Sequence, residues 1–243
     1  MCGKLECSIM KIMKTIIEKI DKNQKNTDII REAGRILKEG GLVAFPTETV
    51  YGLGADALNE DAAKKIYAAK GRPSDNPLII HITNMKALDK IVSEVPEKAV
   101  KVAEKYWPGP LTMIFNKSDI VPYGTTGGLD TVAVRMPVDK IAREVIDAGG
   151  GYIAAPSANT SGRPSPTTAQ HVAEDLTGRV DMIVDGGAVE IGVDSTILDV
   201  TVEPPMILRP GAITKEMFEE VIGEVTVDRT LIRPDSKQVP KAP

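Results

Sequence analysis

Small hydroxyl residues, glycine, proline and single cationic residues occur together in several segments of the chain. The longest of these segments are Pro46-Thr-Glu-Thr-Val-Tyr-Gly-Leu-Gly54, Lys70-Gly-Arg-Pro-Ser-Asp-Asn-Pro77 and Pro156-Ser-Ala-Asn-Thr-Ser-Gly-Arg-Pro-Ser-Pro166. Two shorter ones are Gly192-Val-Asp-Ser-Thr196 and Arg209-Pro-Gly211. Glycine lets backbone N–H groups approach a ligand, proline limits the entropy lost on binding, and arginine offers a fixed fork of donors. The segments therefore predict a rigid pocket for a small polyanion, with a nucleotide triphosphate as the candidate.

Other kinds of site find little support in the residue types. Gly-Leu-Gly54 lacks the third glycine and the following helix of a dinucleotide fingerprint, and neither a Walker phosphate loop nor a G-x-S-x-G elbow occurs. The histidines are only His81 and His171, so Ser–His chemistry is not expected. Cys2 and Cys7 lack the partners needed for a zinc site or a disulfide framework. The types and spacing of these residues indicate a phosphate-bearing ligand, but they do not identify the reaction.

Each of these residues also has a purely structural interpretation. A single loop arginine is more often a solvated charge than a ligand contact. Tyr51 and Trp107 are suited to packing beneath loops. His81 lies in the apolar run 78–82, which favours a hydrogen-bonded core histidine. The occurrence of several such segments, each joined to the end of an apolar run or a helix, favours a binding site.

The elements that must position these loops alternate short apolar runs with amphipathic patterns. Helices are expected over residues 28–38, 62–69, 85–92, 97–106, 141–146, 167–176 and 214–221. Strands are expected over 15–20, 42–45, 78–82, 111–115, 131–136, 152–155, 182–184, 196–200 and 206–208. Asn59 is a predicted N-cap, and Thr167 with Gln170 forms a predicted capping box. Because the link from Val200 to Met206 is too short for a crossover helix, we expect an α/β fold with a mixed sheet.

The composition limits the partners. The 243 residues carry a net charge of −4, whereas proteins that bind long nucleic acids usually have an excess of basic residues. No stretch approaches the roughly 20 apolar residues that span a bilayer, and the first ten residues lack the apolar core of a signal peptide. We therefore expect no membrane contact and a cytoplasmic location.

Seven motifs occur in one order along the chain. They are Gly-Gly-Leu-Val-Ala-Phe-Pro-Thr-Glu-Thr-Val-Tyr-Gly-Leu, Lys-Gly-Arg-Pro-x-x-Asn-Pro-Leu, Trp-Pro-Gly-Pro-Leu-Thr, Val-Arg-Met-Pro, Pro-Ser-Ala-Asn-x-Ser-Gly, Asp-Ser-Thr-Ile and Leu-Arg-Pro-Gly. Through them the chain resembles the YrdC-like family, the threonylcarbamoyl-AMP synthases. The resemblance implies an open, twisted mixed sheet with helices around a basic cavity. It divides the chain into an unmatched leader (1–12), a catalytic domain (13–223) and a linker-like tail (224–243), as in a long form truncated before its second domain.

The resemblance also implies a reaction. L-threonylcarbamoyladenylate and pyrophosphate would form from L-threonine, bicarbonate or CO2, and ATP, with Mg²⁺ accompanying ATP and no protein ligand assigned to the metal. The product would pass to a tRNA threonylcarbamoyl-transferase complex, which modifies the adenosine beside the anticodon. A weak contact with RNA is a further expectation.

Roles for individual residues follow from the same resemblance. The catalytic residues implied are Lys70, Arg72, Ser157 and Asn159. Contacts to ATP are implied for Arg72, Asn76, Thr131, Ser157, Ser165 and Arg209. Contacts to threonine are implied for Thr49, His81, Arg135, Ala155 and Ser195. His81 then faces the ligand, in contrast to the core interpretation above.

Two alternatives remain at this point. One is a YrdC-like module that binds double-stranded RNA without catalysis, which would need an exposed basic groove instead of an enclosed basic cavity. The other is the related carbamoyl-adenylate chemistry of hydrogenase maturation proteins, whose zinc-binding and acylphosphatase-like regions have no counterpart in this sequence.

Overall fold

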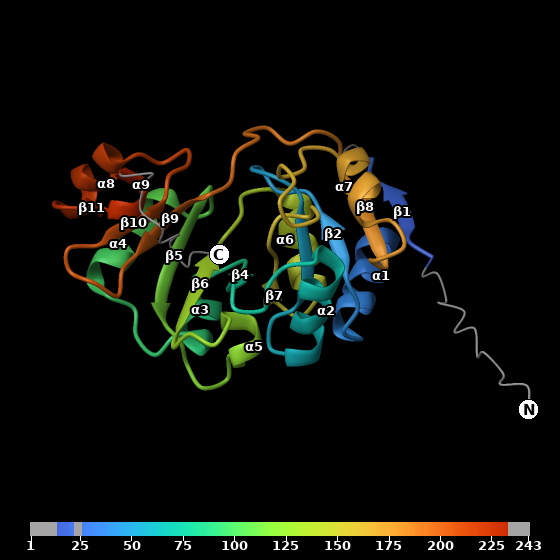
Figure 1. The fold of residues 1–243 in the computed structure, drawn as a ribbon, viewed down its shortest axis with the longest axis horizontal. Helices are drawn as coiled ribbons and strands as arrows, with labels where there is room; N and C mark the ends of the chain where they lie inside the picture. The colour runs from blue at the N-terminus through green and yellow to red at the C-terminus, as the bar shows by residue number, and fades with distance from the viewer. Residues whose placement is uncertain (1–13, 22–25, 233–243) are drawn as a thin grey trace, which may run out of the picture.

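The computed structural model describes residues 14–21 and 26–232, and the predictions made for Cys2, Cys7 and the rest of the leader lie outside them. A single mixed sheet runs through the described part (Figure 1). Its strands, in chain order, are β1 (Ile16–Lys19), β2 (Val43–Phe45), β3 (Gly52–Asp56), β4 (Ile79–His81), β5 (Leu111–Asn116), β6 (Thr131–Arg135), β7 (Ile153–Ala154), β8 (Met182–Asp185), β9 (Thr196–Asp199), β10 (Met206–Arg209) and β11 (Thr226–Val227). Their order across the sheet is β1-β8-β2-β3-β7-β4-β6-β5-β9-β10-β11.

The sheet contains both parallel and antiparallel pairs of strands. Parallel pairs are β1/β8, β2/β8, β4/β6, β5/β9 and β10/β11. Antiparallel pairs are β2/β3, β3/β7, β4/β7, β5/β6 and β9/β10. The predicted mixed α/β sheet is thus confirmed.

Helices cover the two faces of the sheet unequally. The main core joins one face to α2 (Glu60–Lys70), α3 (Met85–Ile91), α4 (Glu97–Tyr106), α7 (Ala169–Leu176) and α8 (Lys215–Ile222). On the opposite face, α1 (Thr27–Lys38) and α6 (Lys140–Ala148) pack over β2, β7 and β8. Two short helices, α5 (Tyr123–Thr126) and α9 (Arg229–Ile232), complete the described elements.

The α1/α6 layer does not extend over the whole of its face. Strand side chains alternate between faces. On β6, Val132 and Val134 enter the main core, so Thr131, Ala133 and Arg135 face the other way. There the described residues contribute only a small apolar cluster made by strands, namely Ile79, Ile114, Ala133 and Ile197, with Leu208 beside it. This region of the sheet is therefore available to carry polar side chains.

The elements agree with the sequence predictions in most places. The short helices α5 and α9 were not predicted, and three further differences follow. Asn59 is the N-cap of α2, as predicted, and its side chain accepts from the amides of Asp61 and Ala62. Residues 52–54, expected within the loop 46–54, belong to β3 (Gly52–Asp56). The cap of α7 is Thr168, whose hydroxyl accepts from the His171 amide, so the predicted Thr167 capping box is wrong by one residue.

The third difference concerns the C-terminal side of the sheet. β11 pairs in parallel with β10 beyond the expected domain boundary at residue 223, so the sheet continues past that point. In the described ranges, no helix combines the length and apolar character needed to cross a membrane.

Candidate functional site

A cavity lies on the part of the sheet face that the α1/α6 layer leaves open. Its walls come from the loop after β2, from β4 and β6, from the loops after α2 and β7, and from the segments that flank β9 and β10. The lining residues are Thr47, Val50, Gly52, Arg72, Ile79, His81, Arg135, Ala155, Pro156, Ser157, Asp194, Ser195 and Arg209. Seven of the predicted site residues are therefore brought together: Arg72, His81, Arg135, Ala155, Ser157, Ser195 and Arg209.

Arg135 forms the floor of the cavity at the carboxyl end of β6. It is buried and pairs with the equally buried Glu48, with Nη2 to Oε1 at 2.6 Å. Its Nη1 donates to the Thr49 hydroxyl at 2.9 Å. Thr49 thus contacts the lining residue Arg135 but does not itself line the cavity. Glu48, the ion-pair partner of Arg135, had no role in the sequence analysis.

His81 lies beside Arg135 because β4 and β6 pair in parallel with these two residues in register. Its Nδ1 is 3.2 Å from the Ile79 carbonyl oxygen, which suits a donating Nδ1–H and leaves Nε2 as an acceptor. Burial, and next the charge of Arg135, lower the pKa of His81 to about 3. The imidazole is therefore neutral near pH 7, and His81 is buried and also lines the cavity.

Ser195 and Arg209 form a second wall. The Ser195 hydroxyl lies 2.8 Å from the Thr112 hydroxyl, and Arg209 donates to it through Nη2 at 3.0 Å. Arg209 Nε also donates to the Ser195 carbonyl at 3.0 Å. These contacts hold the guanidinium against the β9 end of the cavity.

Arg72 is held at the opposite side by the loop that follows α2. Its Nη2 donates to the Pro77 carbonyl at 3.1 Å, and its Nε lies 3.4 Å from the Asn76 carbonyl. The register that pairs Ile79 with Ala133 places Thr131 at the same end of the sheet as Asn76. Asn76 and Thr131 do not line the cavity. Thr131 is the first residue of β6 and Arg135 is the last, so the two residues lie about 13 Å apart at 3.3 Å per residue.

Lys70 lies behind the cavity wall and is almost fully buried. Its ammonium donates to the Ser157 carbonyl, to the Asn159 carbonyl at 2.7 Å and to Asn159 Oδ1 at 3.3 Å. Asn159 in turn donates to the carbonyls of Thr160 and Arg163. An ammonium has three N–H donors, so in this arrangement all of them bond to the loop after β7 and none points at a ligand. Lys70 and Asn159 thus shape the loop that presents Ser157.

Asp194 is a cavity residue for which the sequence analysis gave no role. The Ser165 hydroxyl, a predicted ATP contact outside the cavity lining, lies 3.2 Å and 3.3 Å from its two carboxylate oxygens. Asp194 directly precedes Ser195 in the Asp-Ser-Thr-Ile motif, which was the available signal.

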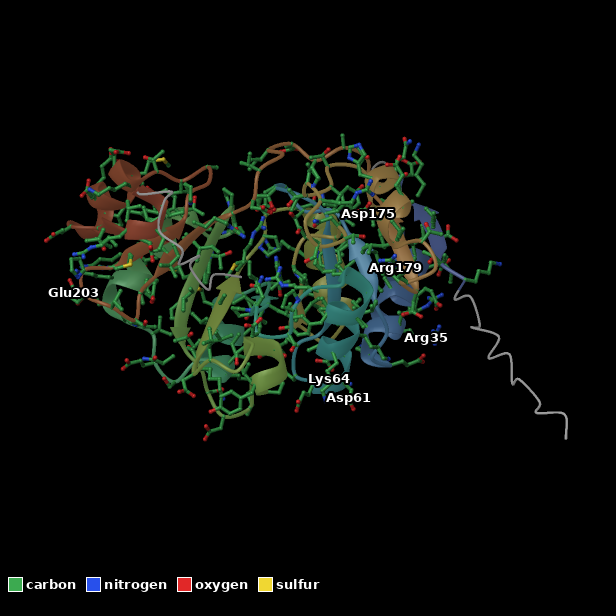
Figure 2. All side chains as sticks on the ribbon, viewed as in Figure 1. Arg35, Asp61, Lys64, Asp175, Arg179 and Glu203 are labelled. Atoms are coloured by element: carbon green, nitrogen blue, oxygen red, sulfur yellow. The ribbon has the colours of Figure 1, made fainter. Side chains whose placement is uncertain are left out.

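The cavity is lined by three arginines and one aspartate, although the chain is acidic overall. Burial lowers the pKa of Arg209, and the charges of Arg135 and Arg72 lower it further against the opposing effect of Asp194. Burial likewise lowers the pKa of Arg72. Figure 2 shows Lys64 and Asp61, which form an ion pair, on the outside of α2. An anionic ligand would relieve the repulsion among these arginines.

Three buried side-chain atoms in the described ranges have no hydrogen-bond partner. They are Glu48 Oε2, Arg135 Nε and Asn76 Oδ1. Buried polar atoms are paired in the large majority of cases, so unpaired ones call for an explanation. All three belong to residues at or beside the cavity, which is the pattern expected of a site that binds a polar ligand.

The side chains of the described residues form no cluster of metal ligands. Within residues 14–21 and 26–232, no group of three or more His, Cys, Asp or Glu side chains could hold a metal ion. Mg²⁺ bound with a nucleotide commonly takes phosphate and water oxygens and only one or two carboxylates. Asp194 is the carboxylate that lines the cavity and fits that requirement.

Comparison with known proteins identifies relatives of this chain. The Sua5/YciO/YrdC family model, described as "Telomere recombination", matches residues 35–211. The threonylcarbamoyl-AMP synthase of Pyrococcus abyssi is 57% identical over 198 residues, which is 82% of this chain and 58% of that protein. The threonylcarbamoyl-AMP synthase of Bacillus subtilis is 50% identical over 231 residues, covering 95% of this chain and 67% of that protein.

A solved structure gives the same result for the fold. The crystal structure of P. abyssi Sua5 complexed with L-threonine superimposes with a TM-score of 0.86 and 51% sequence identity, over 96% of this chain and 66% of that chain. The chain thus spans roughly three fifths to two thirds of the length of these relatives.

Proposed function

Because the chain belongs to the Sua5/YciO/YrdC family, we propose that it makes threonylcarbamoyl-AMP and pyrophosphate from L-threonine, bicarbonate or CO2, and ATP. The two relatives at 50–57% identity are threonylcarbamoyl-AMP synthases. The P. abyssi protein, whose fold this chain shares, was crystallised with L-threonine. The product would serve the threonylcarbamoyladenosine modification of tRNA through a transferase complex.

The observation that carries the proposal is the convergence of Arg72, Arg135 and Arg209 in one cavity. Arg135 is buried and the other two are half-buried, so the positive charge faces an enclosed space instead of an exposed groove. This arrangement favours binding of a small polyanion over the alternative of double-stranded RNA binding.

The reaction suits residues that position and neutralise more than residues that form covalent bonds. The threonine nitrogen bonds to the carbon of CO2 and loses a proton, which gives a carbamate. A carbamate oxygen then bonds to the α-phosphorus of ATP while the bond to the β-phosphate oxygen breaks, and pyrophosphate leaves. In-line transfer at phosphorus depends mainly on positioning and on stabilising charge.

The roles proposed for the side chains follow their places in the cavity. Arg135, with Thr49 and His81, would bind threonine, and the guanidinium of Arg135 would pair with the carboxylate of threonine. Arg72 and Arg209 would neutralise the phosphates as pyrophosphate departs, and Ser157, on the loop that Lys70 holds, would also contact ATP. Asn76 and Thr131 would contact the far end of an extended ATP. Mg²⁺ would enter with the triphosphate.

Equilibrium binding of ATP and of L-threonine, measured separately by calorimetry, tests the proposal. Arg72→Gln should weaken ATP binding by at least about 10-fold, the loss of one charge-assisted contact, and leave L-threonine binding nearly unchanged. The matched control is Arg31→Gln, because Arg31 is exposed on α1. Equal ATP binding by the wild type and Arg72→Gln would contradict the proposed role of Arg72, and a wild type that binds neither ligand would contradict the function.

A further inference from the structure

One motif of the sequence, Trp107-Pro-Gly-Pro-Leu-Thr112, has no role in the proposed reaction. It leads into β5, and its last residue, Thr112, is fully buried. Leu111, Met113 and Phe115 enter the main core, so Thr112 faces the side of the sheet that carries the cavity. The motif thus places a buried hydroxyl group on the cavity side of the sheet.

Thr112 is held against the segment that begins β9. The hydroxyl oxygens of Thr112 and Ser195 lie 2.8 Å apart. The Thr196 amide donates to the Pro110 carbonyl at 3.0 Å, which fixes the backbones of the two segments relative to each other. Ser195 lines the cavity and Thr112 does not, so Thr112 can act on a ligand there only through Ser195.

The hydroxyl group of Ser195 has a limited capacity for hydrogen bonds. A hydroxyl has one hydrogen to donate and two lone pairs that accept. Arg209 Nη2 lies 3.0 Å from the Ser195 oxygen, and a guanidinium can only donate, so this contact uses one lone pair. The other contact is the one with Thr112, in which either oxygen could be the donor.

Burial decides the direction of the bond between the two hydroxyls. In the described part of the chain, the Thr112 hydroxyl has no hydrogen-bond partner besides Ser195. If Ser195 donated, the Thr112 hydrogen would be buried without an acceptor, which is unfavourable. With Thr112 as the donor, both lone pairs of Ser195 are used and its hydrogen must point elsewhere. Because Ser195 lines the cavity, that hydrogen is available to a ligand.

We infer that Thr112 is a positioning residue, which donates to Ser195 and thereby fixes the Ser195 hydroxyl as a hydrogen-bond donor to an oxygen atom of L-threonine. The inference rests on the proposed function, which supplies L-threonine as the ligand. With both lone pairs occupied by Arg209 and Thr112, Ser195 favours an acceptor at that point of the ligand and disfavours a donor.

The variant Thr112→Val tests this role, because valine has nearly the shape of threonine and lacks the hydroxyl group. Calorimetry would measure the affinities for L-threonine and for ATP separately. Thr112→Val should weaken L-threonine binding by about 10-fold, whereas Thr112→Ser, which keeps a hydroxyl, should stay within about 3-fold of wild type. ATP binding should change by less than about 2-fold in both, because Arg209 Nε keeps its bond to the Ser195 carbonyl.

The matched control is Thr126→Val, which also removes a buried hydroxyl group. The Thr126 hydroxyl donates to the Leu129 carbonyl at 2.7 Å, and Thr126 does not line the cavity. This variant should lose stability and keep the affinity of wild type for L-threonine.

A double-mutant cycle with Ser195→Ala shows whether Thr112 acts through Ser195. In the Ser195→Ala background, Thr112→Val should change the affinity for L-threonine by less than about 2-fold, since the oriented hydroxyl is already absent. A further loss of about 10-fold in that background would overturn the inference. So would Ser195→Ala protein that binds L-threonine as tightly as wild type does.

Three other results would contradict the role of Thr112 and leave the proposed function standing. They are unchanged L-threonine binding by Thr112→Val, an equal loss for L-threonine and ATP, and a Thr112→Ser protein as weak as Thr112→Val. If Thr112→Val does not fold, Thr112→Ala replaces it with the same expected loss. A wild type that does not bind L-threonine would overturn both the proposed function and the inference.

Discussion

At the scale of single residues, Lys70 shows how a charged group can serve the site without touching a ligand. Its ammonium is enclosed by the oxygens of Ser157 and Asn159 in the loop after β7. Burial, and next the charge of Arg72, lower its pKa to about 7. The family resemblance implied a catalytic role for Lys70, and its hydrogen bonds are better explained by a positioning role for the loop that carries Ser157.

The lowered pKa predicts a pH dependence of stability. Between about pH 7 and the ordinary lysine pKa of 10.5, the unfolded chain binds a proton at Lys70 that the folded chain does not. The contribution of Lys70 to the free energy of unfolding therefore rises with pH across this window and is lowest below pH 7. Urea unfolding of wild type and Lys70→Met from pH 6 to 10 should show the difference in favour of wild type growing by on the order of a few kcal/mol. A difference that is constant or shrinks with pH would contradict this assignment.

At the scale of elements, periodicity predicted the strands and helices that carry the site, and it failed where close packing decides the residue type. Residues 52–54 were expected within the loop 46–54, and Gly52 and Gly54 are of a residue type that is unfavourable in strands. In the structure, a Cβ atom at Gly54 would lie 2.6 Å from the Phe45 ring and 2.9 Å from Ile153. The glycines are present because neighbouring side chains occupy that space, which a local pattern does not reveal.

The site shows the same division between local pattern and tertiary contact. The family resemblance carried by the motifs implied roles for Arg72, Arg135, Ser195 and Arg209, each of which lies beside a predicted strand or helix. Glu48 had no such signal, since Thr-Glu-Thr is an ordinary sequence. Its importance lies in a contact with Arg135, 87 residues away in the chain, and that contact exists only after the sheet has formed.

The packing of α1 against α6 gives a prediction for an element. A Cβ atom at Gly34 would lie 2.5 Å from the Ala148 carbonyl oxygen, so the helices must separate to admit it. Gly34→Ala should therefore lower the free energy of unfolding by about 1–2 kcal/mol, although alanine alone favours a helix by about 1 kcal/mol. Chemical denaturation measures this, and Arg31→Ala on the exposed side of α1 should stay within about 0.5 kcal/mol of wild type. A more stable Gly34→Ala protein would show that the helices do not meet there.

At the scale of the whole molecule, unequal helix coverage creates the site. Five helices cover one face of the sheet, whereas the α1/α6 layer covers only part of the other. The strands β4, β6 and β10 therefore present side chains to a cavity, which the loops after β2, α2 and β7 complete. Three arginines line this cavity within a chain of net charge −4, which matches a small anionic substrate better than a long nucleic acid.

Pyrophosphate release tests the central claim most directly. Wild type would be incubated with ATP and Mg²⁺, and L-threonine and bicarbonate would be added singly and together. The account predicts pyrophosphate release that requires both, and a loss of at least about 10-fold in Arg72→Gln protein that remains folded, with Arg31→Gln unchanged. Release that does not depend on L-threonine and bicarbonate, or no release by folded wild type that binds ATP and L-threonine, would contradict it.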